Sequence, residues 1–305
     1  MFFSSKKNKA LGISSLLATT FIYGWFGIFS KLIAYDLPLF FSSFIRDILG
    51  IVILGVFLYI KRKSSYKKIA NEDFIWIILR SIFGLISFFS SYIAFVYLEI
   101  GITYFIYFGA FVLAGYFLGL FLFKEKIDLI RGVALAFALL GLYIIYQINI
   151  TPNSGLYILL AGLSGITGAI WNIFSKKVSD KYSALQLNFM DFVFFGSYVL
   201  ILSILRAETW AIPQLSSVWI YNIIFGLSFV VTGQLVIIGF NNLDAQIGSL
   251  IMLTEILFGI ILGFVFFQEI VTVLTLMGGL LIVTAVVLPE LQLEQKPFWK
   301  KLLKR

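Results

Sequence analysis

The sequence predicts an all-α integral membrane protein with ten transmembrane helices, built as two inverted five-helix repeats. Three observations support this fold class. The chain consists mainly of long apolar runs, its Lys and Arg residues gather in alternate connecting segments, and one motif recurs about half a chain length later. Together they predict two halves that cross the bilayer in opposite directions.

The apolar runs predict the spans. Of 305 residues, 61% are hydrophobic and 12% are charged, whereas soluble domains carry about 25% charged residues. Each run is close to the roughly 20 residues that a helix needs to cross the hydrocarbon layer. The runs are continuous rather than alternating, which favours helices over a β-barrel. The expected spans are 10–33, 39–60, 74–97, 100–123, 129–147, 154–174, 184–205, 217–240, 245–267 and 270–288.

The basic residues predict the topology. Of the 23 Lys and Arg residues, 19 fall in the N-terminal segment, in 61–68, 124–131 and 176–181, and in the C-terminal segment. By the positive-inside rule these segments are cytoplasmic, so both termini are inside and the number of spans is even. The net charge of +8 therefore marks one side of a membrane, expected to be a bacterial inner membrane, rather than a nucleic-acid interface.

The chain ends in a basic segment, 291–305, in which Phe298, Trp299 and Leu302 alternate with lysines. This composition favours a tail that lies on the anionic inner surface of the bilayer; a disordered basic tail is the alternative.

An internal repeat indicates the architecture. The motif G-x3-G-x5-E occurs twice, 144 residues apart, at Gly115, Gly119 and Glu125 and again at Gly259, Gly263 and Glu269. It divides the chain into a first repeat, 1–148, and a second, 149–290. Since five spans is an odd number, the second repeat enters the membrane from the opposite side. Inverted repeats are typical of secondary transporters, which bind a solute near the midplane and alternate access. The glycines themselves are expected to serve close helix packing.

These features resemble the drug/metabolite transporter superfamily, EamA-like branch. The resemblance rests on the aromatic segment 23–27 of the first span, on Arg46 in the second span and on the two motif copies, and it extends over nearly the whole chain. It implies the two-repeat fold and transport, since such proteins include exporters of amino acids and related metabolites and permeases for other metabolites. The halves differ chemically: Asp191 occupies the position that matches Arg46, and Asn172 the one that matches Gly27.

Several charged residues fall inside or at the ends of spans, where a charge costs about 2.5–3.5 kcal/mol at the helix centre. Arg46 and Asp47 point about 100° apart on one helix, so we expect partners on other helices. We expect Arg80 to extend to the cytoplasmic headgroups. Lys31 ends the first span at the outer face, where extension to the headgroups and a role in an outer gate are both open.

Two acidic residues are candidates for proton coupling. Glu255 lies near the middle of its span, and Asp191 lies about seven residues inside another. A carboxyl group removed from water favours its neutral form and so can accept and release a proton. A fixed structural hydrogen bond is the alternative for both.

The resemblance implies a central cavity formed by helices of both repeats. An aromatic wall with amides and one acid suits a small amphipathic or zwitterionic solute. The expected substrate-binding residues are Trp25, Tyr104, Tyr107, Trp171, Asn172, Gln234 and Glu255.

Composition also excludes several activities. The chain has no Cys and no His, which removes thiol chemistry, the usual zinc ligands and Ser-His-Asp catalysis, and no phosphate-binding P-loop is present. We therefore expect no catalytic residues, metal or cofactor, and a small-molecule substrate moved by gradients or exchange. Export of amino acids is the leading function. An importer or exchanger of a nucleoside-like or methyl-donor metabolite is the alternative, followed by a lipid enzyme; direction and oligomeric state are open.

Overall fold

The computed structural model describes residues 8–33, 36–61, 66–98, 100–146, 155–268 and 270–302. Within these ranges, side chains are described except at 27, 30, 31, 95, 96, 100, 101, 263, 267 and 290–302. The side chain of Lys31, the predicted outer-face charge, lies outside the described residues. Glu269 of the second motif copy also lies outside the described residues. For Gly263 and for the basic tail up to residue 302, only the backbone is described.

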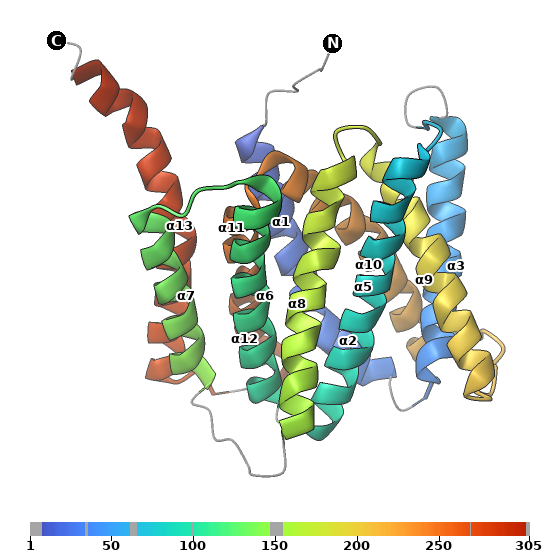
Figure 1. Ribbon diagram of the computed structural model, residues 1–305. Helices are drawn as coiled ribbons and strands as arrows, with labels where there is room; N and C mark the ends of the chain where they lie inside the picture. Colours follow the sequence, from blue (N-terminus) through green and yellow to red (C-terminus); the bar gives the residue numbers. More distant parts are fainter. Residues whose placement is uncertain are drawn as a thin grey trace. The chain divides into compact units, whose positions relative to one another are not determined.

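The described residues form helices and no strands (Figure 1). The helices are α1 (Lys9–Gly24), α2 (Phe26–Ile33), α3 (Leu39–Ile60), α5 (Asn71–Tyr97), α6 (Ile100–Phe123), α7 (Leu129–Tyr146), α8 (Gly155–Val178), α9 (Ala184–Leu205), α10 (Ser217–Asn242), α11 (Ala245–Met252), α12 (Thr254–Phe267) and α13 (Val273–Leu302).

The helices are those of a multi-pass membrane protein. In the part of the chain that is described, eight helical stretches are long and apolar enough to cross a bilayer, and Val273–Pro289 is a shorter apolar helix. The predicted span 10–33 is divided at Trp25, whose N–H donates to the Ile22 carbonyl at 3.1 Å, three residues back instead of four. This tightens the helix into a turn, so the first span appears as α1 and α2. The count of ten spans stays a prediction.

Two further departures concern the C-terminal part. The predicted span 245–267 is interrupted at Leu253, whose N–H donates to the Leu250 carbonyl at 3.1 Å and separates α11 from α12. The last helix does not stop at the predicted boundary near residue 288, because α13 continues to Leu302. The backbone of the predicted tail is therefore helical up to that residue.

The chain forms two compact units. Unit 1 comprises Met1–Leu85 and Trp171–Asn242, and unit 2 comprises Ile86–Ile170 and Leu243–Arg305. The helices α5 and α8 each contribute to both. Each compact unit thus combines segments of the first and second predicted repeats, so the sequence repeats are not themselves the compact bodies.

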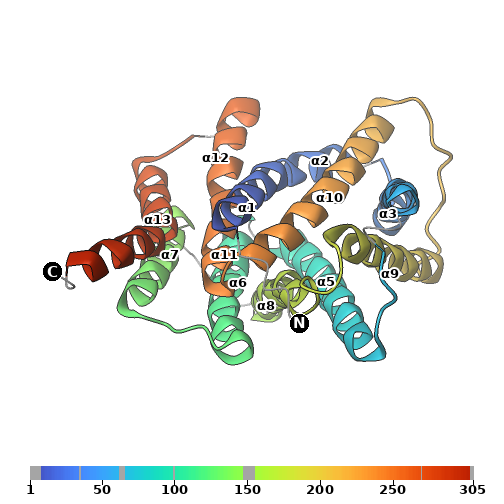
Figure 2. The same cartoon turned by 90° about the horizontal axis from the view of Figure 1, so that it is seen from above.

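In unit 1, α3 packs along α9, and α10 packs on α1, α2 and α3. The view from above shows α3 and α9 as neighbours (Figure 2). Three apolar clusters lie among the described residues of unit 1. One of them joins α3, α9 and α10 through Leu54, Phe192 and Val230. The second contains Phe41, Trp219 and Phe225, and the third contains Ile77, Val178, Tyr182, Leu187 and Ile237.

In unit 2, α13 packs on α7, and the short helix α11 packs on α6. The first motif copy explains the second contact. A Cβ on Gly115 would collide with Ser249 of α11, and one on Gly119 would lie 2.9 Å from Gln246 Cγ. Only glycine at these positions lets the two helices approach, which confirms the expected packing role for the first motif copy. For Gly259 of the second copy the expectation is wrong, because a Cβ there would have no neighbouring atom of the described residues within 4 Å.

The acid of the motif completes this contact. The Glu125 carboxylate accepts hydrogen bonds from the Ala245 N–H at 2.7 Å and the Gln246 N–H at 3.2 Å. These are orphan donors at the start of α11, and a carboxylate there also meets the positive end of the helix dipole. Beside it, Arg131 binds Asp244 at 2.6 Å. Glu125 is therefore a capping residue that fixes the start of α11.

Candidate functional site

The central feature of unit 1 is an ion pair inside the span region. Arg80 of α5 contacts Asp191 of α9 through Nη1 and Oδ2, and the two side chains are 2% and 6% exposed. Arg80 Nε also donates to the backbone carbonyl of Trp171 in α8 at 2.9 Å. The expectation that Arg80 extends to the headgroups is therefore wrong, because its guanidinium is buried among α5, α8 and α9.

Apart from Asp191 Oδ2, which forms the ion pair, three polar atoms around it have no hydrogen-bond partner among the described residues. They are Arg80 Nη2, Trp171 Nε1 and Asp191 Oδ1, and all are buried. The guanidinium carbon lies 5.9 Å from the centroid of the Trp171 ring, so these atoms belong to one cluster, hereafter the Arg80 cluster. A buried unpaired donor costs about 1–3 kcal/mol, and more when it is charged. The cluster thus contains two donors and one acceptor that no described residue satisfies.

A second buried cation of unit 1 is fully engaged. Arg46 of α3 donates to the Asn222 side-chain oxygen of α10 at 2.8 Å and to Ser43 Oγ at 2.7 Å. Its guanidinium lies 4.7 Å from the centroid of the Phe225 ring. Another helix, α10, supplies Asn222 and Phe225, as predicted, whereas Ser43 belongs to α3 itself. The neighbouring Asp47 packs toward α9. A Cβ atom added to Gly196 of that helix would lie 3.2 Å from the Cβ atom of Asp47.

The predicted binding residues of unit 1 are distributed over two regions. Trp171 joins the Arg80 cluster, and the neighbouring Asn172 is 2% exposed. Trp25 lies at the turn between α1 and α2, with its ring 6.4 Å from that of Phe29. Gln234 lies on α10, and its Nε2 is buried without a hydrogen-bond partner among the described residues. Of these residues, Trp171 contacts the ion pair.

Unit 2 contains the other candidate acid. Glu255 lies on α12, two residues after the interruption at Leu253, and is half-buried. Its carboxylate has electrostatic interactions with the phenols of Tyr104 on α6 and Tyr146 on α7. Among the described residues it has no hydrogen bond and no ion pair. Glu255 and Tyr104 are thus brought together as predicted candidates, and Tyr146 is a third member that sequence reasoning missed.

Tyr107, the remaining predicted binding residue, packs against α8 within unit 2. A Cβ on Gly168 would lie 3.0 Å from the Tyr107 hydroxyl oxygen and 2.9 Å from Ser87 Oγ. The adjacent Ser87 hydroxyl donates to the Ser164 carbonyl at 2.8 Å. The side chain of Tyr107 therefore faces a helix surface of small residues.

Sequence reasoning did not identify Asn222 as the partner of Arg46 or Tyr146 as a neighbour of Glu255. An available signal was the rarity of an amide inside an apolar span, which applies to Asn222. The repeat spacing was a second signal, which applies to the two buried contacts of unit 1. Arg80 and Phe225 are 145 residues apart, as are Arg46 and Asp191, so the two contacts occupy matching positions of the repeats. Tyr146 had no comparable signal, because tyrosine is common at the ends of spans.

Comparison with known proteins places these features in context. The model of the EamA-like transporter family matches the chain twice, over residues 10–147 and 155–289. A search of curated protein sequences finds no match. One solved crystal structure superposes with a TM-score of 0.75 at 13% identity, over 91% of this chain and 97% of that chain. At that sequence identity, the similarity to the solved structure shows the fold alone. The two matches to the family model coincide with the two predicted repeats, 1–148 and 149–290.

Proposed function

Because the chain belongs to the EamA-like transporter family, we propose that it is a secondary transporter that exports amino acids or related small zwitterionic solutes by alternating access. The single observation that carries this substrate class is the Arg80 cluster, with its unpaired buried donors and acceptor. Ionisable residues inside membrane spans are costly, and they typically mark the path of a substrate or ion.

The chemistry of the cluster suits a zwitterion. A carboxylate would accept from Arg80 Nη2 and Trp171 Nε1, and an ammonium would donate to Asp191 Oδ1. Arg80 and Asp191 already neutralise each other, so a zwitterion adds no net charge, whereas a simple anion or cation adds an uncompensated one. The indole face of Trp171 also attracts a cation.

The remaining predicted binding residues are proposed as further solute contacts, each within its own unit. They are Trp25, Tyr104, Tyr107, Asn172, Gln234 and Glu255. Their assignment rests on the resemblance to family members, and it supplies the aromatic and amide surfaces that an amphipathic solute needs.

Glu255 is proposed as the proton-coupling residue. Asp191 has a fixed counter-charge in Arg80, whereas the Glu255 carboxylate forms no ion pair among the described residues and interacts electrostatically with the phenols of Tyr104 and Tyr146. A carboxyl group without a counter-charge in a low-dielectric region favours proton uptake. This difference favours Glu255 over Asp191.

The proposed location is the cell membrane, an inner membrane in a bacterium with two, with both termini cytoplasmic. The support is the concentration of 19 of 23 Lys and Arg residues in segments assigned to one side and the positive-inside rule.

The test is the thermal stability of the purified protein across a metabolite panel. The panel contains amino acids, their amides, the corresponding deaminated acids and decarboxylated amines, nucleosides, and a sulfonium methyl donor. A rise in Tm with amino acids but not with their single-charge analogues supports the proposal. A response to a nucleoside, to the methyl donor or only to lipid overturns the substrate class. Uptake of the labelled hit into vesicles of each orientation then assigns direction.

A further inference from the structure

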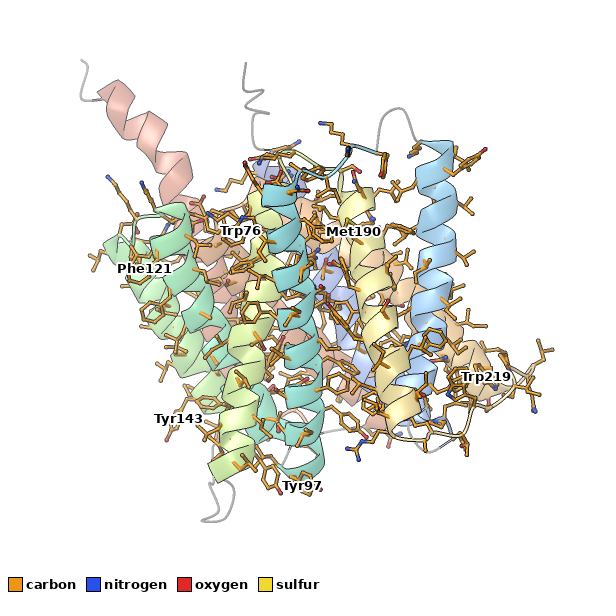
Figure 3. All side chains as sticks on the ribbon, turned by 45° about the vertical axis from the view of Figure 1, so that its right-hand side comes forward. Trp76, Tyr97, Phe121, Tyr143, Met190 and Trp219 are labelled. Atoms are coloured by element: carbon orange, nitrogen blue, oxygen red, sulfur yellow. The ribbon has the colours of Figure 1, made fainter. Side chains whose placement is uncertain are left out.

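Unit 1 contains an apolar groove that the transport proposal does not use. Its volume is about 260 Å³, and it lies between α9, the end of α3 and the segment that precedes α5. Met190, one of its lining residues, is labelled in Figure 3. The lining residues are Leu58, Tyr66, Ile69, Gln186, Phe189, Met190, Val193 and Phe194. We call this the α9 groove.

A second groove occupies the matching place on the other repeat. It has a volume of about 290 Å³ and is lined by residues of α3 and α10. Its residues Ile45, Ile48 and Leu49 match Met190, Val193 and Phe194 of the α9 groove at a spacing of 145 residues. We call it the α3 groove. The repeat thus provides two related apolar grooves within unit 1.

The two grooves differ in the accessibility of the charge beside them. The α3 groove is lined by Arg46, which is buried and hydrogen-bonded to Asn222 and Ser43, whereas the charges beside the α9 groove are exposed. Lys67 and Lys68 are exposed and lie between Tyr66 and Ile69, which line the α9 groove. At a spacing of 145 residues, these lysines correspond to Ile212 and Pro213. Only the α9 groove therefore carries a pair of lysines on the segment that forms its wall.

Hydrogen bonds hold this segment in place. Lys67 N donates to Gln186 Oε1 at 3.0 Å, and Gln186 Nε2 donates to Lys67 O at 2.7 Å. Ala70 N donates to the Tyr182 hydroxyl at 3.0 Å. These bonds fix the backbone on both sides of the lysines and leave the ammonium groups at the surface. The lysine pair is preorganised rather than part of a loose loop.

The neighbouring turn adds a further anchor. The Tyr182 hydroxyl donates to Asp73 Oδ2 at 2.8 Å, and Lys181 Nζ donates to Asp73 Oδ1 at 2.7 Å. This hydrogen bond to Asp73 raises the pKa of the Lys181 ammonium. Lys181 therefore forms an ion pair with Asp73, whereas Lys67 and Lys68 have no ion pair among the described residues.

We propose that the α9 groove binds an anionic phospholipid, with an acyl chain along the groove and the phosphate on Lys67 and Lys68. The groove is smaller than the roughly 300–1,000 Å³ of a typical small-molecule site, and hydrocarbon forms most of its wall. A membrane-spanning surface meets lipid chains. Lysines at the end of a span attract anionic headgroups by about 1 kcal/mol each.

The first test measures lipid binding to the full-length protein in a neutral detergent. Phosphatidylglycerol and phosphatidylcholine with identical acyl chains are added separately, and retained lipid is counted by native mass spectrometry while Tm is recorded. We expect phosphatidylglycerol to be retained preferentially and to raise Tm. The double variant Lys67→Gln/Lys68→Gln should weaken its binding by roughly tenfold or more. The control Lys124→Gln/Lys126→Gln removes the same charge from unit 2 and should leave binding unchanged.

The second test examines the groove itself. Val193→Phe places a ring in the α9 groove, and Ile48→Phe places one at the matching position of the α3 groove. We expect only Val193→Phe to reduce retained phosphatidylglycerol. Equal loss in the two lysine double variants, equal retention of the two lipids, or the same Tm shift with glycerol phosphate would overturn the proposal. The surface lysine variants keep the test decisive if a phenylalanine variant fails to fold.

Discussion

Arg46 and Asp191 occupy matching positions in the two repeats, and each contacts the third helix of the other repeat. Arg46 of α3 lies over Phe225 of α10, and Asp191 of α9 binds Arg80 of α5. Phe225 and Arg80 are themselves separated by the repeat spacing of 145 residues. The two contacts are thus related by the repeat, yet one is a cation over an aromatic ring and the other an ion pair. Within unit 1, the two repeats therefore place their contacts at matching positions but use different residue types to form them.

Breaking the ion pair should destabilise unit 1 strongly. Arg80→Gln or Asp191→Asn leaves an uncompensated charge in a buried site, at a cost of about 3–5 kcal/mol. The double variant should recover much of that loss, because neither charge remains. Thermal and denaturant unfolding in detergent, arranged as a double-mutant cycle, measures the coupling. Additive losses would show that the pair does not interact.

Trp171→Phe should reduce recognition of the carboxylate while keeping an aromatic ring. Loss of the Nε1 donor should raise KM for an amino acid by about tenfold or more, the size expected for one hydrogen bond to a charged group. Trp76→Phe is the matched control, since Trp76 packs on Phe174 in the same unit. An equal rise in KM in Trp171→Phe and Trp76→Phe would indicate a packing role for Trp171.

Glu255→Gln should remove the dependence of transport on a pH gradient. Glutamine keeps the size of the side chain but cannot bind and release a proton. Transport by reconstituted vesicles with and without an imposed gradient measures this. Glu125→Gln serves as the control, because Glu125 caps α11. Unchanged gradient dependence in Glu255→Gln would remove this residue from the coupling mechanism.

Glu125→Ala should act on stability rather than on specificity. Loss of the cap exposes orphan N–H groups at the start of α11, which costs about 0.5–2 kcal/mol. The lower Tm should accompany an unchanged ranking of solutes in the metabolite panel. Glu125→Gln retains a side-chain acceptor and should lose less. A change of solute ranking without loss of Tm would assign Glu125 to the transport path.

Much of the fold was predictable because its signals are local. The bounds of α3, α6 and α9 agree with the predicted spans, since helix length in a membrane follows directly from an uninterrupted apolar run. The turns at Trp25 and Leu253 were not predictable. Both arise from hydrogen bonds to a carbonyl three residues back. Gly24 and Gly27 lie beside Trp25, but glycine is frequent in membrane helices and does not by itself predict a turn there. No proline or glycine adjoins Leu253.

The candidate site, like the fold, was predictable only in part. The sequence identified Arg80, Asp191 and Glu255 as candidates, because charged residues inside membrane spans are energetically costly and usually functional. It placed Arg80 at the headgroups, whereas the structure buries it against Asp191. The long side chain of Arg80 could extend to the headgroups or turn inward to a buried partner, and the sequence does not distinguish the two. The approach of α9 to α5 decides it, because it brings Asp191 within reach.

The amino-acid sequence by itself determined the membrane class, the helices and the internal repeat, because hydrophobicity and motif spacing act along the chain. The tertiary structure alone decided which buried charges meet, which carboxylate caps α11, and that each compact unit takes segments from both repeats. Those outcomes depend on contacts between residues more than 100 positions apart, and helix packing, not local pattern, selects them.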